Sequence, residues 1–161
     1  MLSLEEARAR MLAGVEPLPA EDVELGQALA RVLAEPVSSR LTLPPWDNSA
    51  MDGFAVRAAD LTGASEQEPR RLRVIGEAAA GRAVTSAVER DACFRILTGA
   101  PLPAGADAVV PLEDTDAPAG ATELQSAVTI FRPPARGAHI RRAGSDLRLG
   151  QSLLAAGDVL G

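Results

Sequence analysis

Glycine, proline and aspartate separate the apolar residues into short runs from Val37 onward, and this spacing most limits what the chain can fold into. A long amphipathic helix needs an uninterrupted helical period, whereas short Val-, Ile- and Leu-rich runs between turn residues are typical of β-strands. We therefore predict a mainly β fold with short strands. The predicted strands are Phe54–Val56, Leu72–Ile75, Cys93–Leu97, Ala108–Pro111, Val128–Phe131, His139–Arg141, Ser152–Leu154 and Val159–Leu160.

The N-terminal residues are the part of the chain that keeps a helical pattern. Ser3 and Glu6 have the spacing of a capping box, and the apolar residues that follow fall on one helical face. This pattern predicts a helix over Leu4–Ala13. A second short helix is predicted over Leu25–Leu33, because its apolar residues recur at helical spacing and Pro36 prevents continuation.

Composition excludes several classes of protein. The 161 residues carry a formal net charge of −6 and only four aromatic side chains, which argues against nucleic-acid binding and against anionic membrane surfaces. The longest uncharged stretch, Ile96–Ala106, is far shorter than the roughly 20 apolar residues that span a bilayer. The acidic N-terminus does not resemble a secretory signal, so we expect a cytoplasmic protein. The single cysteine, Cys93, cannot form an internal disulfide and is interpreted as a small buried hydrophobe.

Positive charge gathers near the C-terminus. All 16 basic residues of the chain are arginine, and five of them fall between residues 132 and 148, opposed within that span only by Asp146. These five residues, called the arginine strip below, are Arg132, Arg136, Arg141, Arg142 and Arg148. Two interpretations stay open, a strip that attracts anions and a solvated strand edge that prevents aggregation.

The loop Leu43–Gly53 is the most unusual segment. Its prolines fix an extended backbone, Asp47 and Asn48 are residues that bond back to their own turn, and Gly53 relieves a tight exit. Such a loop would present Asp47 and Asp52 to a hard cation, since Mg²⁺ takes one or two protein carboxylates together with substrate phosphates and water. The alternative is a turn in which these side chains satisfy only backbone groups.

Two further segments contain groups suited to anions. In the first, residues 95–107, a strand runs into Thr98 and Gly99, where Thr98 is placed to donate to an oxyanion; a plain strand-to-loop turn is the alternative. It is not a phosphate loop, because the chain contains no lysine. In the second, residues 137–146, Arg141 lies on the outward face of a half-buried strand and is suited to clamp a phosphate. The only histidine, His139, is interpreted as a strand-surface residue, so no zinc cluster or Ser/His/Asp grouping is indicated.

Three long motifs resemble the molybdopterin molybdenumtransferase family, of the MoeA and gephyrin E-domain type. They occur in the order and at about the spacing of that family, and the resemblance spans essentially the whole chain. The motifs are PPWDNSAMDGFAV at Pro44–Val56, RILTGAPLPAGADAVVPLEDT at Arg95–Thr115 and HIRRAGSDLRLGQSLLAAGDVL at His139–Leu160. Two positions depart from the family pattern, since His139 replaces the usual Asn and Ser145 the usual Glu.

The resemblance implies the fold of the N-terminal region of that family, a complex arrangement of bifurcated, coiled β-sheets with a short N-terminal helix and an elongated second subdomain. It implies three parts in this chain. Residues 1–18 would form a helix that packs on an α/β domain absent here, residues 19–44 with 135–161 an elongated linker and dimerisation subdomain, and residues 45–134 the β-rich domain. It also implies a homodimer.

The implied activity is insertion of molybdate into adenylylated molybdopterin, with Mg²⁺, during molybdenum cofactor biosynthesis. The motif positions implicated in catalysis are Asp52, Thr98 and Asp146, with Asp52 also expected at the metal. Substrate contacts are expected at Asp47, Asn48, Ser49, Gly99 and Arg141. We expect this chain to be inactive without its α/β domain; the alternative is a non-enzymatic binding or dimerisation module of the gephyrin scaffold type.

Overall fold

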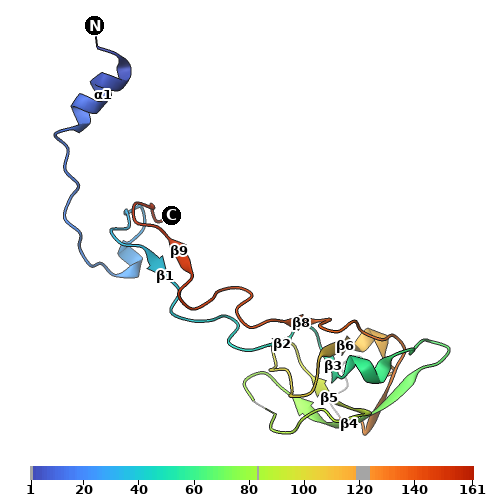
Figure 1. The fold of residues 1–161 in the computed structure, drawn as a ribbon. Coiled ribbons are helices and arrows are strands. Elements are labelled where there is room, and N and C mark those ends of the chain that lie inside the picture. The colour runs from blue at the N-terminus through green and yellow to red at the C-terminus, as the bar shows by residue number, and fades with distance from the viewer. Residues whose placement is uncertain (1, 83, 119–123) are drawn as a thin grey trace. The chain divides into compact units, whose positions relative to one another are not determined.

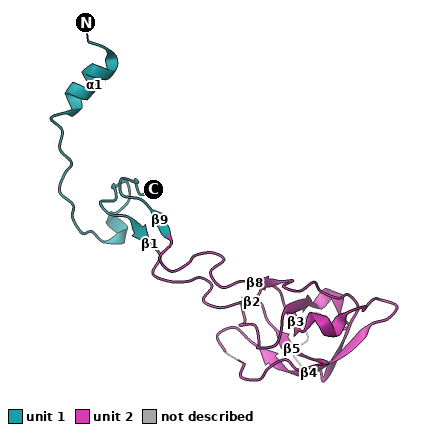
Figure 2. Ribbon diagram, viewed as in Figure 1, with its two compact units in different colours: residues 1–38, 152–161 teal, residues 39–151 magenta. Residues whose placement is uncertain are grey.

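The computed structural model describes residues 2–82, 84–118 and 124–161, which form two compact units. The smaller unit comprises residues 1–38 and 152–161, and the larger comprises residues 39–151 (Figure 2). None of the helices in the described ranges is long and apolar enough to cross a membrane. The functional division into 1–18, 19–44 with 135–161, and 45–134 stays a prediction.

A five-stranded sheet forms the centre of the larger unit (Figure 1). β4 and β5 run parallel, and the other neighbouring strands are antiparallel. In spatial order the strands are β6 (Ala108–Pro111), β3 (Gly53–Val56), β5 (Ala92–Ile96), β4 (Arg70–Ala78) and β7 (Ala127–Ile130). All five overlap predicted strands, and the prediction of a mainly β fold is confirmed. β4 extends beyond the predicted Leu72–Ile75 because its first residues pair with β7 and its last with β5.

The central strands are covered on both faces. Phe54 and Val56 of β3 belong to one hydrophobic cluster, whereas Ala55 between them belongs to a second. β5 divides in the same way, with Cys93 in the first cluster and Phe94 in the second. Side chains alternate across a strand, so a strand covered on both faces is apolar throughout rather than alternating with polar residues. This explains why the sequence of β3 contains no polar side chain, whereas β5 is interrupted only by the half-buried Arg95.

Two short strand pairs complete the β structure. In the larger unit β2 (Asn48–Ser49) pairs with β8 (Ile140–Arg141), and in the smaller unit β1 (Val37–Ser38) pairs with β9 (Ser152–Leu154). The sequence pattern missed β1 and β2 because each is two residues long and mostly polar. β8 and β9 agree with predicted strands, and Ile140 packs toward the core while Arg141 is exposed.

The smaller unit contains the predicted N-terminal helix. α1 spans Leu4–Leu12, and its capping box is present: Glu6 N–H donates to the Ser3 hydroxyl, and Ser3 N–H donates to the Glu6 carboxylate. None of the residues of α1 is buried, and its apolar side chains Leu4 and Met11 are largely exposed.

The second predicted helix, Leu25–Leu33, is wrong. Only a single 3-10 turn forms, over Leu25–Gln27, and Ala30 then adopts a left-handed backbone with φ of 62°. The following residues instead pair with the C-terminal segment, where Ala30 N–H donates to Leu160 (2.7 Å) and Leu33 N–H donates to Asp158 (2.9 Å). Long-range backbone pairing therefore outweighs the helical spacing of the apolar residues. Predicted strand Val159–Leu160 reduces to an isolated bridge between Val32 and Val159.

Candidate functional site

The strand β2 joins the three motifs that the sequence analysis singled out. On β8 its partners are Arg141, opposite Asn48, and Ile140, opposite Ser49. It also bonds the 98–102 loop, since Ser49 N–H donates to Ala100 (3.0 Å) and the Ser49 carbonyl accepts from Gly99 N–H (2.9 Å). A two-residue strand thus brings segments from near residues 50, 100 and 140 into one place.

Asp52 and Thr98 form the most direct link between the first two motifs. One carboxylate oxygen of Asp52, Oδ1, accepts hydrogen bonds from both the backbone N–H and the hydroxyl of Thr98, each at 2.7 Å. These bonds, with the nearby Arg95 charge, hold the pKa of the exposed Asp52 carboxyl below its ordinary value. Asp52 is therefore an ionised, solvent-facing carboxylate in a fixed orientation.

Gly53 directly follows Asp52 and is the first residue of β3, where the backbone lies very close to β6. A Cβ at this position would lie 2.0 Å from the carbonyl oxygen of Val110 on β6. Only glycine lets the two backbones approach this closely. The tight exit expected from the sequence is therefore a close strand-to-strand contact.

Asp47 links the first motif to the third. Its Oδ1 accepts from Ala143 N–H (2.8 Å) and its Oδ2 accepts from the Arg142 guanidinium (2.6 Å). The backbone bond from Ala143 is the largest contribution to a lowered pKa, and the charge-assisted bond from Arg142 adds to it. Both oxygens are occupied, so Asp47 acts as a clamp between the loop and the turn after β8.

Asp146 and Arg141 form an ion pair within the third motif. The Arg141 guanidinium donates to Oδ2 of Asp146, and the Ser145 hydroxyl donates to Oδ1. These two bonds lower the pKa of Asp146. Backbone bonds fix the turn as well, since Asp146 N–H donates to Leu43 (3.0 Å) and Gly144 N–H donates to Pro44 (2.9 Å). Both side chains remain more than two-fifths exposed.

The other expected substrate contacts differ in accessibility. Ser49 is buried, and its hydroxyl donates to the Met51 carbonyl (2.6 Å). Asn48 is 8% exposed, and its Oδ1 has no hydrogen-bond partner within the described residues. Gly99 is exposed in a left-handed conformation with open space around it. A ligand therefore has direct access at Gly99 and not at Ser49.

His139 has a backbone conformation that most non-glycine residues avoid. Its φ is 55°, in the left-handed region that Asn and His adopt more readily than most residues. Its carbonyl accepts from Ala50 N–H (2.9 Å), which extends the β2–β8 pairing. The position requires a left-handed backbone conformation, which His139 adopts.

Acidic residues of the larger unit neutralise most of the arginine strip, and all of them except Asp146 lie outside residues 132–148. Four of its five arginines form ion pairs. The pairs are Arg132 with Glu66 and Asp114, Arg136 with Asp107, Arg141 with Asp146 and Arg142 with Asp47. A local charge count could not detect partners up to 95 positions away in the chain. The sequence therefore did not indicate that Arg142 binds Asp47 and so helps to hold the site together.

A magnesium ion fits this site only as one shared with a substrate. Across residues 2–82, 84–118 and 124–161, no three His, Cys, Asp or Glu residues form a group that could hold a metal. Both oxygens of Asp47 and of Asp146 are bonded within the protein, whereas no bond in the described chain involves Oδ2 of Asp52. One carboxylate oxygen plus phosphates and water is an ordinary Mg²⁺ arrangement, so Asp52 fits this role.

Comparison with known proteins gives consistent matches. A family model described as the MoeA N-terminal region (domain I and II) matches residues 2–161. "Molybdopterin molybdenumtransferase 2" of Mycobacterium tuberculosis is 40% identical over 152 residues, covering 94% of this chain and 35% of the relative. The "Molybdopterin molybdenumtransferase" of Synechococcus elongatus is 40% identical over 163 residues, covering 99% of this chain and 39% of the relative.

The structural comparison agrees. The crystal structure of the molybdopterin biosynthesis moeA protein from Pyrococcus horikoshii superimposes with a TM-score of 0.77 and 35% sequence identity. The match covers 88% of this chain and 36% of that chain. This chain spans between 35% and 39% of the length of the two curated relatives.

Proposed function

The chain belongs to the MoeA N-terminal region family, and from this membership we propose that it forms part of a molybdopterin molybdenumtransferase acting in molybdenum cofactor biosynthesis. The observation that carries the proposal is the junction at β2, which unites the three motifs and leaves Asp52 ionised and exposed beside Thr98. The Oδ2 of Asp52, open among the described residues, is the oxygen that a ligand or metal ion would contact.

The proposed substrates are molybdate and adenylylated molybdopterin. A Mg²⁺ ion bound with the substrate would neutralise phosphate charge and act as a Lewis acid. Asp52 would supply the protein oxygen to that ion through Oδ2. The Thr98 N–H and hydroxyl keep the Asp52 carboxylate aligned and ionised. This role requires no proton transfer by Asp52.

The residues of the third motif would contact the anionic substrate. Arg141 is more than half exposed and bonds Asp146 through one guanidinium nitrogen, so its other N–H groups can donate to a phosphate or oxyanion. Asp146 orients the Arg141 guanidinium. Gly99 provides an open backbone where a ligand can approach closely.

The pterin-binding part of the enzyme is proposed to lie in the portion of the relatives that this chain does not match. We therefore propose that this chain alone does not insert molybdate, and that the complete protein works as a homodimer. It would contribute one wall of a shared site, in which the larger unit supplies Asp52, Thr98 and Arg141.

A chimera tests this function. The chain would replace the matched region of the Mycobacterium tuberculosis relative, and molybdate insertion into adenylylated molybdopterin would be measured. We expect turnover by the chimera and none by the 161-residue chain. A folded, dimeric chimera without turnover, or turnover by the chain alone, would contradict the proposal.

A further inference from the structure

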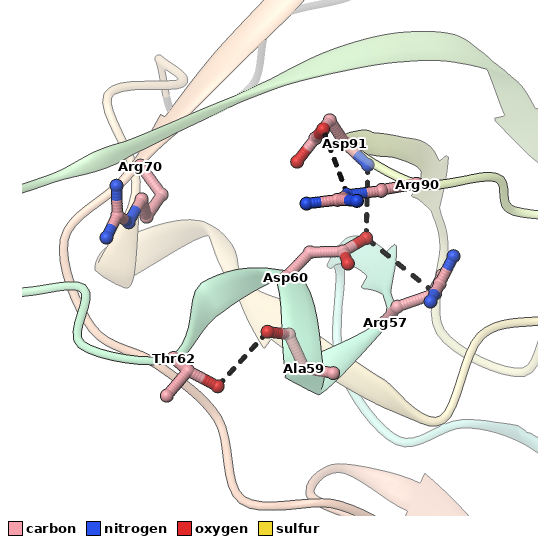
Figure 3. Close-up of a pocket in the computed structure, with 7 residues that line it drawn as sticks. All are labelled: Arg57, Ala59, Asp60, Thr62, Arg70, Arg90 and Asp91. Carbon is pink, nitrogen blue, oxygen red and sulfur yellow. Dashed lines mark hydrogen bonds and ion pairs between the residues drawn. The ribbon is translucent and has the colours of Figure 1, made fainter.

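A polar hollow of about 440 Å³ lies at the end of the sheet where β3 ends and β4 and β5 begin (Figure 3). None of its lining residues belongs to the site around Asp52. They are Arg57, Ala59, Asp60, Thr62, Arg70, Arg90 and Asp91. The lining contains no large apolar or aromatic side chain, so it does not suit the apolar ligands that most small-molecule pockets take.

The charge of the hollow is positive. Three guanidinium groups face two carboxylates, which leaves a net charge of +1. Arg57 lies 3.7 Å from Asp60 and Arg90 lies 3.7 Å from Asp91, distances well beyond the roughly 2.7–2.9 Å of a charge-assisted hydrogen bond. Arg70 makes no ion pair with any residue that the structure describes. The carboxylates therefore leave most guanidinium N–H groups available.

Asp60 joins the segments that line the hollow, so its arginines lie on connected parts of the fold. Its side chain is only 7% exposed, and its Oδ2 accepts from Asp91 N–H at 3.1 Å. This bond ties the 3-10 turn Ala58–Leu61 to the turn before β5. Arg73 N–H donates to the Asp91 carbonyl (3.1 Å) and so fixes the same turn to β4. Arg57, Arg70 and Arg90 are thus mounted on segments that are bonded to one another.

We propose that this hollow binds a phosphate dianion, either free phosphate or the phosphate group of a small monoester. Guanidinium groups match the oxygens of a phosphate and donate paired hydrogen bonds to them. In Figure 3 Arg70 lies on one side of the hollow and Arg57 and Arg90 on the other, with Asp60 between them, so guanidinium donors line the hollow from two sides. The volume exceeds that of a phosphate and leaves room for a small polar group.

Phosphate binding to the 161-residue chain tests the proposal. Inorganic phosphate and glycerol phosphate would be titrated by calorimetry at constant ionic strength, against the parent and the variants Arg70→Gln and Arg90→Gln. Each substitution removes charge-assisted bonds, and we expect each to weaken binding about tenfold. Arg71→Gln is the matched control, because Arg71 is the neighbouring arginine on β4 and does not line the hollow.

Comparing the two ligands distinguishes free phosphate from a phosphate monoester as the natural ligand. Tighter binding of glycerol phosphate supports a monoester as the natural ligand, and tighter binding of inorganic phosphate supports the free ion. Circular dichroism and thermal melts would confirm that the variants are folded. The proposal is overturned if neither ligand gives saturable binding, or if Arg71→Gln weakens binding as much as Arg70→Gln does.

Discussion

The three aspartates at the junction of the motifs each accept two side-chain hydrogen bonds from the protein, but these bonds are distributed differently over the two carboxylate oxygens. Asp47 and Asp146 have both carboxylate oxygens bonded, whereas the bonds of Asp52 all fall on Oδ1. All three have a lowered pKa, so all three are ionised at neutral pH. The pKa alone does not separate them. The distribution of the bonds does, because both oxygens of Asp47 bond the protein whereas Oδ2 of Asp52 is open within the described chain, and this is why we propose a structural role for Asp47 and a ligand contact for Asp52.

Asp47→Ala should therefore destabilise the larger unit. The substitution leaves Ala143 N–H and the Arg142 guanidinium without their acceptor. Because the Asp47 side chain is about one-third exposed, water replaces part of the loss, and we expect about 1 kcal/mol lower free energy of unfolding. Urea denaturation measures it. An unchanged stability combined with lost activity in the chimera would instead make Asp47 a substrate contact.

The same residue gives a prediction for acid pH. The folded-state pKa of Asp47 lies below its ordinary 3.8, so the ionised form stabilises the fold. This contribution is complete above the unfolded-state pKa and is lost as the pH falls through the folded-state pKa. Asp47→Asn cannot titrate at this position, so the stability difference between parent and Asp47→Asn should shrink as the pH falls from about 5 to 2. A difference that stays constant over this range would show that the carboxylate charge does not contribute.

At the scale of elements, the clearest predicted strands were those whose residues are all buried, such as β3 and β6. Such strands need apolar residues at successive positions, and this run is visible in the sequence. β2 has no such signature, because its two polar residues are specified by backbone bonds to β8 and to the 98–102 loop. The helix expected at Leu25–Leu33 failed for a related reason, since its apolar spacing is local and its backbone partner is the C-terminal segment.

The candidate site divides in the same way. The positions of Asp52 and Thr98 were expected from their motifs, but their mutual hydrogen bonds depend on a contact across 46 positions of the chain. Neither Arg142 as an anchor nor Asp47 as a clamp was expected, because residue spacing carries no information on which acid meets which arginine. The motifs indicated the candidate residues, and the structure shows which of them bond one another.

Gly53→Ala tests the packing of β3 against β6. The added Cβ would lie 2.0 Å from the Val110 carbonyl oxygen, and the strands must separate to accept it. Overpacking of this kind costs about 1–3 kcal/mol, and more where backbone must move. Thermal and urea unfolding would measure the loss. Gly26→Ala is the control, since a Cβ there meets nothing within 4 Å and no positive φ opposes it; equal stability of the two variants would contradict the close approach.

At the scale of the whole molecule, the chain spans little more than a third of the length of its curated relatives. Within that part, a sheet with both faces buried supports a loop, a turn and a two-residue strand that hold three separate motifs together. We propose that the junction at β2 presents Asp52 to a ligand and does not merely close the fold.

Asp52→Asn in the chimera tests this claim most directly. The amide keeps the shape but supplies no charge and a weaker oxygen ligand, so we expect turnover to fall at least about tenfold, or about 1.4 kcal/mol of transition-state stabilisation. The melting temperature should remain that of the parent chimera, and Glu68→Gln, which removes an exposed carboxylate away from the three motifs, should leave turnover unchanged. Turnover would be measured with adenylylated molybdopterin and molybdate at limiting and at saturating Mg²⁺. Equal turnover of Asp52→Asn and the parent at both Mg²⁺ concentrations would contradict the account.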